Sequence, residues 1–159
     1  MNLTPFLIAP LLIQLHAGAA LLALLLGPYL LFGRNRAGHR WLGYLWVLSM
    51  ATTALSSFGI SGFGLIGPFS PIHLLAILTL WALWQAIRHV RRGEISAHRQ
   101  VMRNLYGYGL LIAALLNFLP DRRVNKMLFA QQPELGFLVI ALGGLLLLLW
   151  WGMGWQGRR

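Results

Sequence analysis

Cysteine is absent from the sequence, and charged residues are scarce among its 159 residues. Without cysteine the chain has no disulfide, no thiolate metal site and no iron–sulfur cluster held by Cys, so any metal must bind His, Met or oxygen. Charged residues make up 10% of the chain, whereas a soluble domain carries about 25%. Hydrophobic residues make up 58%, and the mean hydropathy is +0.67. This composition predicts an integral membrane protein, with a single domain over residues 1–159.

Acidic residues are especially few: three Asp and Glu stand against 13 Lys and Arg, which gives a net charge of +10. All three acids, Glu94, Asp121 and Glu134, fall between the apolar runs. A small-molecule transporter is therefore disfavoured, because the runs lack the intramembrane carboxylates typical of proton or cation transport. The sequence also has no phosphate-binding loop and no Ser-His-Asp arrangement. The basic residues sit in short segments that meet the lipid bilayer, so no nucleic-acid partner is expected.

Five apolar runs approach or exceed the roughly 20 residues that a helix needs to cross a bilayer. They cover residues 9–32, 39–60, 71–90, 98–118 and 136–155. The sequence predicts an all-α fold in which the first four runs form two helical hairpins, packed as a four-helix transmembrane bundle with a pseudo-two-fold axis. The fifth run predicts a C-terminal transmembrane helix. The loop before it contains "VNKMLFA", which is typical of a short interfacial helix.

The basic residues divide unequally between the two sides of this predicted fold. Three of them, Arg122, Arg123 and Lys126, lie in the loop before the fifth run. The other ten lie on the opposite side: Arg34, Arg36, Arg40, Arg88, Arg91, Arg92, Arg99, Arg103, Arg158 and Arg159. Because loops rich in Lys and Arg stay in the cytoplasm, the N-terminus is expected outside and the C-terminus inside the cytoplasmic membrane. The first run lacks the features of a cleaved signal peptide, so it is expected to be retained.

Four of the five histidines are spaced as a duplication. His16 lies in the outer half of the first run and His39 opens the second, while His73 opens the third and His98 opens the fourth. In an antiparallel four-helix bundle, the first and third helices are diagonal, as are the second and fourth, so each pair faces across the bundle. The inner pair, His39 and His98, matches in depth. His16 lies about 9 Å from the start of its helix and His73 about 3 Å from its own, at 1.5 Å per residue.

Two levels of paired imidazole in a membrane bundle are typical of two b-type haems, in which iron takes axial His nitrogens. The predicted ligands are His16 with His73 and His39 with His98. Arg40, Arg99 and Arg103 stand beside the inner pair, where their guanidinium groups would bind the carboxylates of an inner porphyrin. The small residues of "HAGAA" around His16 would let a flat ligand approach closely.

The same residues have an alternative interpretation. Arg and His near the ends of spans commonly extend to the headgroups, and small residues commonly serve helix packing without a ligand. A haem-free accessory protein that binds lipid or a protein partner through its His-Arg pairs therefore stays open. A bare zinc or copper ion fits less well than a wide ligand across the bundle. His89, within "RHVRR", is expected to belong to a solvated cationic loop.

Three segments, "LHAGAALLALLLGPYLL", "GHRWLGYLWVLSM" and "AHRQVMRNLYGYGLL", resemble an uncharacterised family of bacterial multi-pass membrane proteins, one of the domain-of-unknown-function families. The resemblance covers about residues 10–118 and implies a fold without an activity. In arrangement alone, the chain is also similar to the diheme transmembrane cytochromes b that respond to ascorbate. That similarity implies His16, His73, His39 and His98 as haem ligands.

The function that these observations favour is that of a b-type cytochrome-like protein with two haems, each held by two histidines. It would move electrons across the bilayer between a quinol or another small reductant and an acceptor, and so act as a membrane oxidoreductase. Neither the reductant nor a protein partner is defined by the sequence.

Overall fold

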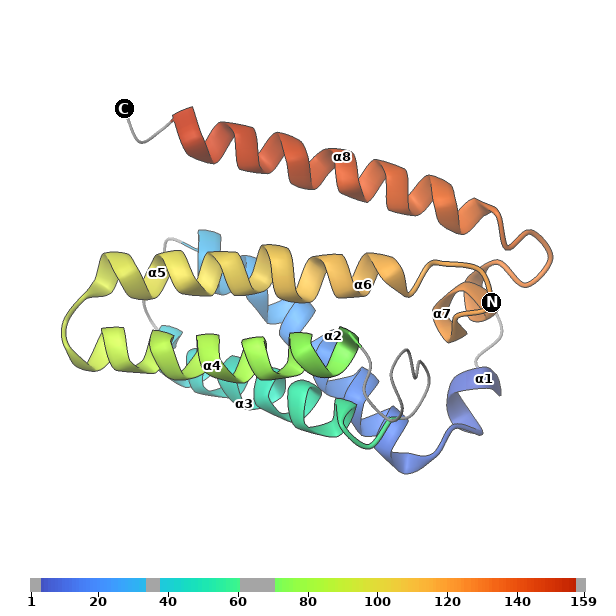
Figure 1. The fold of residues 1–159 in the computed structure, drawn as a ribbon, viewed down its shortest axis with the longest axis horizontal. Helices are drawn as coiled ribbons and strands as arrows, with labels where there is room; N and C mark the ends of the chain where they lie inside the picture. The colour runs from blue at the N-terminus through green and yellow to red at the C-terminus, as the bar shows by residue number, and fades with distance from the viewer. Residues whose placement is uncertain (1–3, 34–37, 61–70, 157–159) are drawn as a thin grey trace. The chain divides into compact units, whose positions relative to one another are not determined.

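The computed structural model of the chain is built from helices throughout the residues that it describes, which are 4–33, 38–60 and 71–156 (Figure 1). No strand occurs in these ranges. The described residues form α-helices and one π-helix. In chain order the elements are α1 (Thr4–Leu7), α2 (Leu11–Phe32), α3 (His39–Ser57), α4 (Pro71–Arg91), α5 (Ile95–Asn104), the π-helix η1 (Leu105–Leu111), α6 (Ile112–Leu116), α7 (Arg123–Leu128) and α8 (Leu135–Gln156).

The predicted apolar runs correspond closely to helices of the structure. The first three match α2, α3 and α4, and the fifth matches α8. The fourth run, expected as one α-helix, is divided into α5, η1 and α6. The helix expected in "VNKMLFA" is present as α7. Four arginines used to predict the orientation, Arg34, Arg36, Arg158 and Arg159, lie outside the described residues.

The chain divides into two compact units. The first, which we call the hairpin unit, consists of Pro10–Leu110; the second, the terminal unit, consists of Met1–Ala9 with Leu111–Arg159. In the hairpin unit, α2 packs on α3, α3 on α4 and α4 on α5, with a smaller contact between α2 and α5. Consecutive helices are therefore neighbours, and the contact of the first helix with the last connects the ends of the series.

Side-chain contacts show that neighbouring helices of the hairpin unit run antiparallel. His16 of α2 contacts Ser56 of α3, whereas further along α2 the indole Nε1 of Trp46 donates to the Ala23 carbonyl at 2.9 Å. Helices α2 and α3 therefore run in opposite directions. In α4 and α5, His98 contacts Ala86. The short connection between α4 and α5, residues 92–94, makes these two helices antiparallel neighbours.

A proline inside α2 is compensated by a side chain of η1. Pro28 has no N–H, so the carbonyl of Leu24, four residues earlier, loses its usual helical donor. The hydroxyl of Tyr106 donates to that same carbonyl at 3.1 Å. The Tyr106 ring lies directly against Gly27, where a methyl group would overlap the ring. We call Gly27, Leu24 and Tyr106 the proline clamp, because together they connect α2 to η1 at the proline.

Asn125 organises the terminal unit. Its side chain is fully buried, and Nδ2 donates to the carbonyls of Phe118 at 2.7 Å and Pro133 at 2.8 Å. Gly136, at the start of α8, lies against the Phe118 carbonyl and Asn125, with no room for a side chain. Arg123 of α7 donates to the Pro5 carbonyl at 3.0 Å, which ties α7 to the N-terminal residues. One buried amide therefore holds the connection between α6 and α8.

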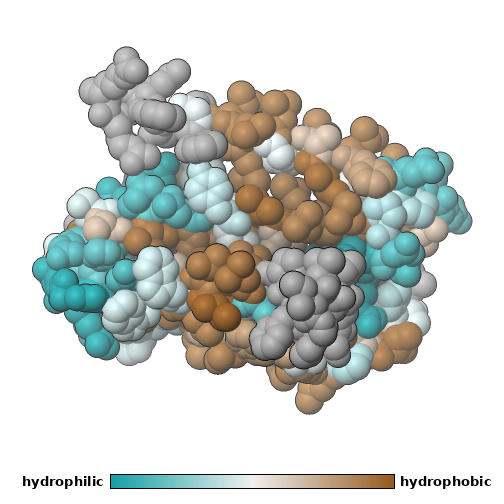
Figure 2. All heavy atoms as spheres, viewed as in Figure 1, coloured by the Kyte–Doolittle hydropathy of each residue, from teal (hydrophilic) through white to brown (hydrophobic). Residues whose placement is uncertain are grey.

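Large apolar side chains remain exposed along the long helices, including Leu25 of α2, Ile77 of α4 and Leu138 of α8. Soluble monomers rarely expose contiguous apolar surfaces of this extent. Figure 2 shows hydrophilic residues gathered at the turn between α4 and α5. Among the described helices, α2 alone is long and apolar enough to span a membrane by length and composition, and α8 contains a shorter apolar stretch, Leu135–Trp150.

Candidate functional site

His16 of α2 and His73 of α4 both contact residues at the C-terminal end of α3. The Nδ1 atom of His16 is 3.0 Å from the hydroxyl oxygen of Ser56, in the last turn of α3. The His73 ring lies 5.6 Å, centroid to centroid, from that of Phe58, the residue that caps the same helix. His73 is buried and only 9% exposed. The structure therefore places both predicted outer histidines against the same end of α3, where the residues that they contact, Ser56 and Phe58, are two positions apart.

The hydrogen bonds of Ser56 determine which atom of His16 carries a proton. The Ser56 hydroxyl lies 2.6 Å from the Thr52 carbonyl and 3.1 Å from that of Thr53, and a carbonyl can only accept. Since the single hydroxyl proton is used there, Ser56 Oγ accepts from His16 Nδ1–H. In the neutral imidazole the other nitrogen, Nε2, then keeps its lone pair. His16 is thus held in the tautomer in which Nε2 is the possible metal ligand.

Hydroxyl side chains along α3 were not singled out by sequence reasoning. Ser49 and Thr53 donate to the carbonyls of Leu45 and Ser49 at 2.8 Å and 2.9 Å, and Ser57 donates to that of Ala54 at 2.7 Å. Each of these protons is therefore used within α3, as commonly happens to Ser and Thr inside helices. The spacing of these residues by three and four, on one face of α3, was the available signal in the sequence.

His98 is held in the same way as His16, but by the backbone. Its Nδ1 lies 2.9 Å from the carbonyl oxygen of Ala86, on the neighbouring helix α4. Because a carbonyl only accepts, Nδ1 must carry the proton, and Nε2 is left as the possible ligand atom of the neutral ring. A histidine that binds metal usually donates its second ring N–H to a carbonyl or carboxylate, which fixes the ring's orientation. His98 has this second contact.

The remaining predicted site residues are more exposed. His39 and Arg40 are exposed in the first turn of α3, where the Arg40 guanidinium carbon lies 6.0 Å from the Tyr44 ring centroid. Arg99 is exposed and Arg103 half-buried on α5. His39 and His98 each lie near the N-terminal end of their helix, on α3 and α5. The described residues show no direct bond between these two histidines.

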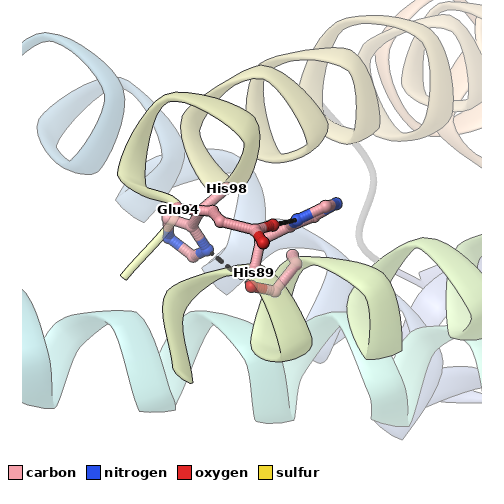
Figure 3. A network of polar contacts seen from close by, with 4 residues as sticks. His89, Glu94 and His98 are labelled. Carbon is pink, nitrogen blue, oxygen red and sulfur yellow. Dashed lines mark hydrogen bonds and ion pairs between the residues drawn. The ribbon is translucent and has the colours of Figure 1, made fainter. Parts of the chain in front are cut away.

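His89 and Glu94 pair at the turn between α4 and α5 (Figure 3). Gly93 has a positive φ of 74°, and the N–H groups of Gly93 and Glu94 donate to the carbonyls of Val90 and His89, which is the Schellman ending of a helix. The Nδ1 of His89 and a carboxylate oxygen of Glu94 form an ion pair across this ending. That hydrogen bond is the main reason that the pKa of the Glu94 carboxyl is lowered from its ordinary value.

This contact corrects the expectation that His89 belongs to a solvated loop. His89 lies in the last turn of α4, its side chain is 28% exposed, and it has a specific partner. The pairing joins two residues five apart, across a glycine in the left-handed region. A helical reading of the sequence places such residues on different faces, and for this reason the contact was missed. The spacing of His89 to Gly93 and Glu94 was the signal that would have indicated it.

No group of three or more His, Cys, Asp or Glu side chains that could surround a metal ion occurs in the described part of the chain. A site made from pairs of histidines is not tested by this observation. His16, Trp46, His98 and Tyr106 make polar contacts between helices of the hairpin unit, and large apolar side chains are exposed on its outside. This arrangement defines an all-helical protein whose outer surface suits a lipid environment better than water.

Comparison with known families agrees with this class. The chain belongs to the family described as Predicted membrane protein (DUF2306), whose model matches residues 13–149. The match includes all five histidines and most of α8. No curated protein and no solved structure matches the chain. The family thus confirms the prediction of an uncharacterised membrane protein family, and the similarity to cytochromes b receives no support from these comparisons.

Proposed function

We propose that this protein is a b-type cytochrome-like electron carrier of the membrane, with two haems each held by two histidines. The observation that supports the proposal is the tautomer shared by His16 and His98. Each donates Nδ1–H to an oxygen on a neighbouring helix, and each therefore keeps an Nε2 lone pair for iron. One of these histidines lies at each end of the hairpin unit, as two haem levels require.

The second ligands in this proposal are His73 at the outer level and His39 at the inner level. His73 reaches the same end of α3 as His16. His39 is exposed at the start of α3, and one turn further along the helix Gly43 has open space on the side where a Cβ would stand. A planar group can approach a helix closely at such a position. Arg40, Arg99 and Arg103 lie on the two helices that bear the inner histidines and would bind the haem carboxylates.

Haem supplies one-electron transfer when it is bound. The chain's residues hold and orient it. Ser56 and the Ala86 carbonyl fix the rings of His16 and His98, because each accepts a hydrogen bond from Nδ1–H and so keeps the proton on that nitrogen. Apolar side chains around the helices exclude water, and exclusion of water raises the strength of charge interactions near the iron. A quinol or another small reductant is the electron donor in this proposal.

The proposal includes a membrane topology. Helices α2, α3 and α4, the segment from α5 to α6, and α8 form five spans, with the first four as an antiparallel bundle of two hairpins. The N-terminus lies outside and the turn between α4 and α5 in the cytoplasm, because most arginines are on that side. The close contacts between consecutive helices and the apolar surfaces of α2 and α8 support this arrangement.

Reporter fusions test the topology. A reporter joined after Glu94 should give a cytoplasmic signal, and one joined after Met127, in α7, a periplasmic signal. The arginines near Glu94 disfavour transfer of that turn across the membrane. Fusions at residues 33 and 60 provide matched controls on the two sides. A periplasmic signal at residue 94 together with a cytoplasmic signal at residue 127 would show that the orientation is reversed.

The outer haem level is tested by comparing two substitutions in the purified protein. His16→Ala should abolish one low-spin haem component, because it removes an iron ligand. Ser56→Ala should keep that component but change its midpoint potential, because a contact behind a ligand adjusts its basicity without bonding to iron. Ser57→Ala, which changes a hydroxyl one residue away that is bonded only within α3, is the control. Equal and mild effects of all three changes would contradict the assignment of His16.

A further inference from the structure

Six exposed side chains form one stripe along the outer face of α4. The residues are spaced by three and four, so they lie on one side of the helix. From the N-terminal to the C-terminal end the stripe consists of Leu74, Ile77, Trp81, Trp84, Arg88 and Arg91. All six belong to the hairpin unit and are exposed. We call this set the α4 stripe.

The chemistry of the α4 stripe changes in one direction. Its first two residues are aliphatic, the next two are tryptophans, and the last two are arginines. Aliphatic groups match acyl chains, and tryptophan is enriched where acyl chains meet the polar headgroups. Arginine binds phosphate through charge-assisted hydrogen bonds. The order along α4 is therefore the order of the parts of one phospholipid molecule, from its tails to its phosphate.

The length of the α4 stripe fits the same molecule. From Ile77 to Arg88 there are eleven steps, which at 1.5 Å per residue span about 16 Å. The hydrocarbon of one leaflet is about 15 Å thick, half of the roughly 30 Å of the whole bilayer. An acyl chain beside Ile77 thus places its phosphate at the level of Arg88.

A contact with Trp84 holds the basic end of the stripe in place. The Arg88 guanidinium carbon lies 5.3 Å from the centroid of the Trp84 ring, a cation–π contact that holds Arg88 along the helix. Glu94, the acid in this turn, forms its ion pair with His89. The positive charges of Arg92 and Arg88 also lower the pKa of the Glu94 carboxyl. The Schellman ending at Gly93 fixes the direction in which α4 ends.

We propose that the α4 stripe is a binding site for one anionic phospholipid, with the phosphate held by Arg88 and Arg91. Arg92, exposed next to Arg91, and Arg99, exposed on α5, add positive charge to the same turn and favour a headgroup of net negative charge over a zwitterionic one. The proposal requires α4 to be a membrane helix and does not depend on haem. Its failure and the failure of the cytochrome proposal can therefore be distinguished.

The test uses tryptophan fluorescence, to which Trp81 and Trp84 contribute two of the chain's seven tryptophans. Trp81→Phe with Trp84→Phe gives the quenching that the other five report. The full chain is placed in phosphatidylcholine vesicles that contain brominated phosphatidylglycerol or brominated phosphatidylcholine, and quenching of tryptophan fluorescence is measured. The wild type should bind phosphatidylglycerol in preference to phosphatidylcholine. In Arg88→Gln with Arg91→Gln this preference should fall by about fivefold for each arginine removed, the contribution expected of one arginine near a membrane surface. Arg88→Lys should retain most of it.

The control is Arg158→Gln with Arg159→Gln, which removes the same charge from the C-terminal end on the same proposed side. An equal loss of preference in both double variants would show that net charge alone acts, and would overturn the proposal. So would displacement of the brominated lipid by inorganic phosphate, which has no acyl chain. A change of oligomeric state in the stripe variants, with lipid preference unchanged, would assign the stripe to a second copy of the chain instead.

Discussion

Replacing either His39 or His98 by alanine is expected to abolish the same low-spin haem component in the absorption spectrum of the purified protein. Both histidines are assigned to one inner haem, so loss of either would remove a ligand of the same iron. The double substitution should be little worse than either single one, because ligands of one site act as a unit and their effects are not additive. The outer component, assigned to His16 and His73, should remain.

The matched control for this pair is His89→Ala. His89 also uses Nδ1 in a hydrogen bond, to Glu94, and lies in the same region of the chain as His98. Its loss should leave both haem components present. Arg40→Ala and Arg99→Ala should retain haem with an altered potential or weaker retention, since they would contact only the carboxylates. If the arginine changes dominate and the histidine changes are mild, the lipid or partner-binding alternative replaces the inner haem.

The second large effect is expected at the proline clamp. Tyr106→Phe removes the donor to the Leu24 carbonyl, which then has neither its helical partner at Pro28 nor a substitute. A polar group left unpaired in an apolar interior costs about 1–3 kcal/mol. Gly27→Ala should lower stability by a similar amount, about 1–3 kcal/mol, because overfilled packing forces side chains to move. Here the Tyr106 ring must shift. Thermal unfolding in detergent or lipid measures both changes.

A double-mutant cycle distinguishes the proline clamp from general packing. The methyl group of Gly27→Ala displaces the Tyr106 ring and with it the hydroxyl, so the second substitution has less left to remove. The two changes together should therefore cost clearly less than the sum of the single costs. Gly43→Ala is the control, because nothing lies near its Cβ position. Strict additivity at Gly27 and Tyr106 would show that the hydroxyl does not hold the Leu24 carbonyl.

Helix positions could be predicted from the sequence because apolar length and charged or glycine breaks determine them locally. The run 71–90 corresponds to α4, which ends at Arg91, and the run 136–155 to α8. The division of the run 98–118 could not be predicted in this way. Gly107 and Gly109 lower α-helical preference there, but the π-helical turn also depends on where Tyr106 meets α2, a contact between residues 82 positions apart.

The histidine levels were predictable for the same reason that the hairpins were. Similar spacing, 23 residues from His16 to His39 and 25 from His73 to His98, places histidines at corresponding ends of antiparallel helices. The structure brings His16 and His73 to one end of α3. The tautomers were not predictable, because they depend on which oxygen of a neighbouring helix faces each ring. Ser56 and the Ala86 carbonyl become visible as partners only when the helices are packed.

The central claim is that the protein binds two haems through paired histidines, and one measurement tests it most directly. The full chain, expressed with ample haem and purified from the membrane, is examined by absorption spectroscopy before and after reduction with dithionite, with haem content per chain determined on the same sample. We expect sharp reduced bands of low-spin b-type haem and two haems per chain. A protein that is folded by thermal unfolding and contains no haem would contradict it.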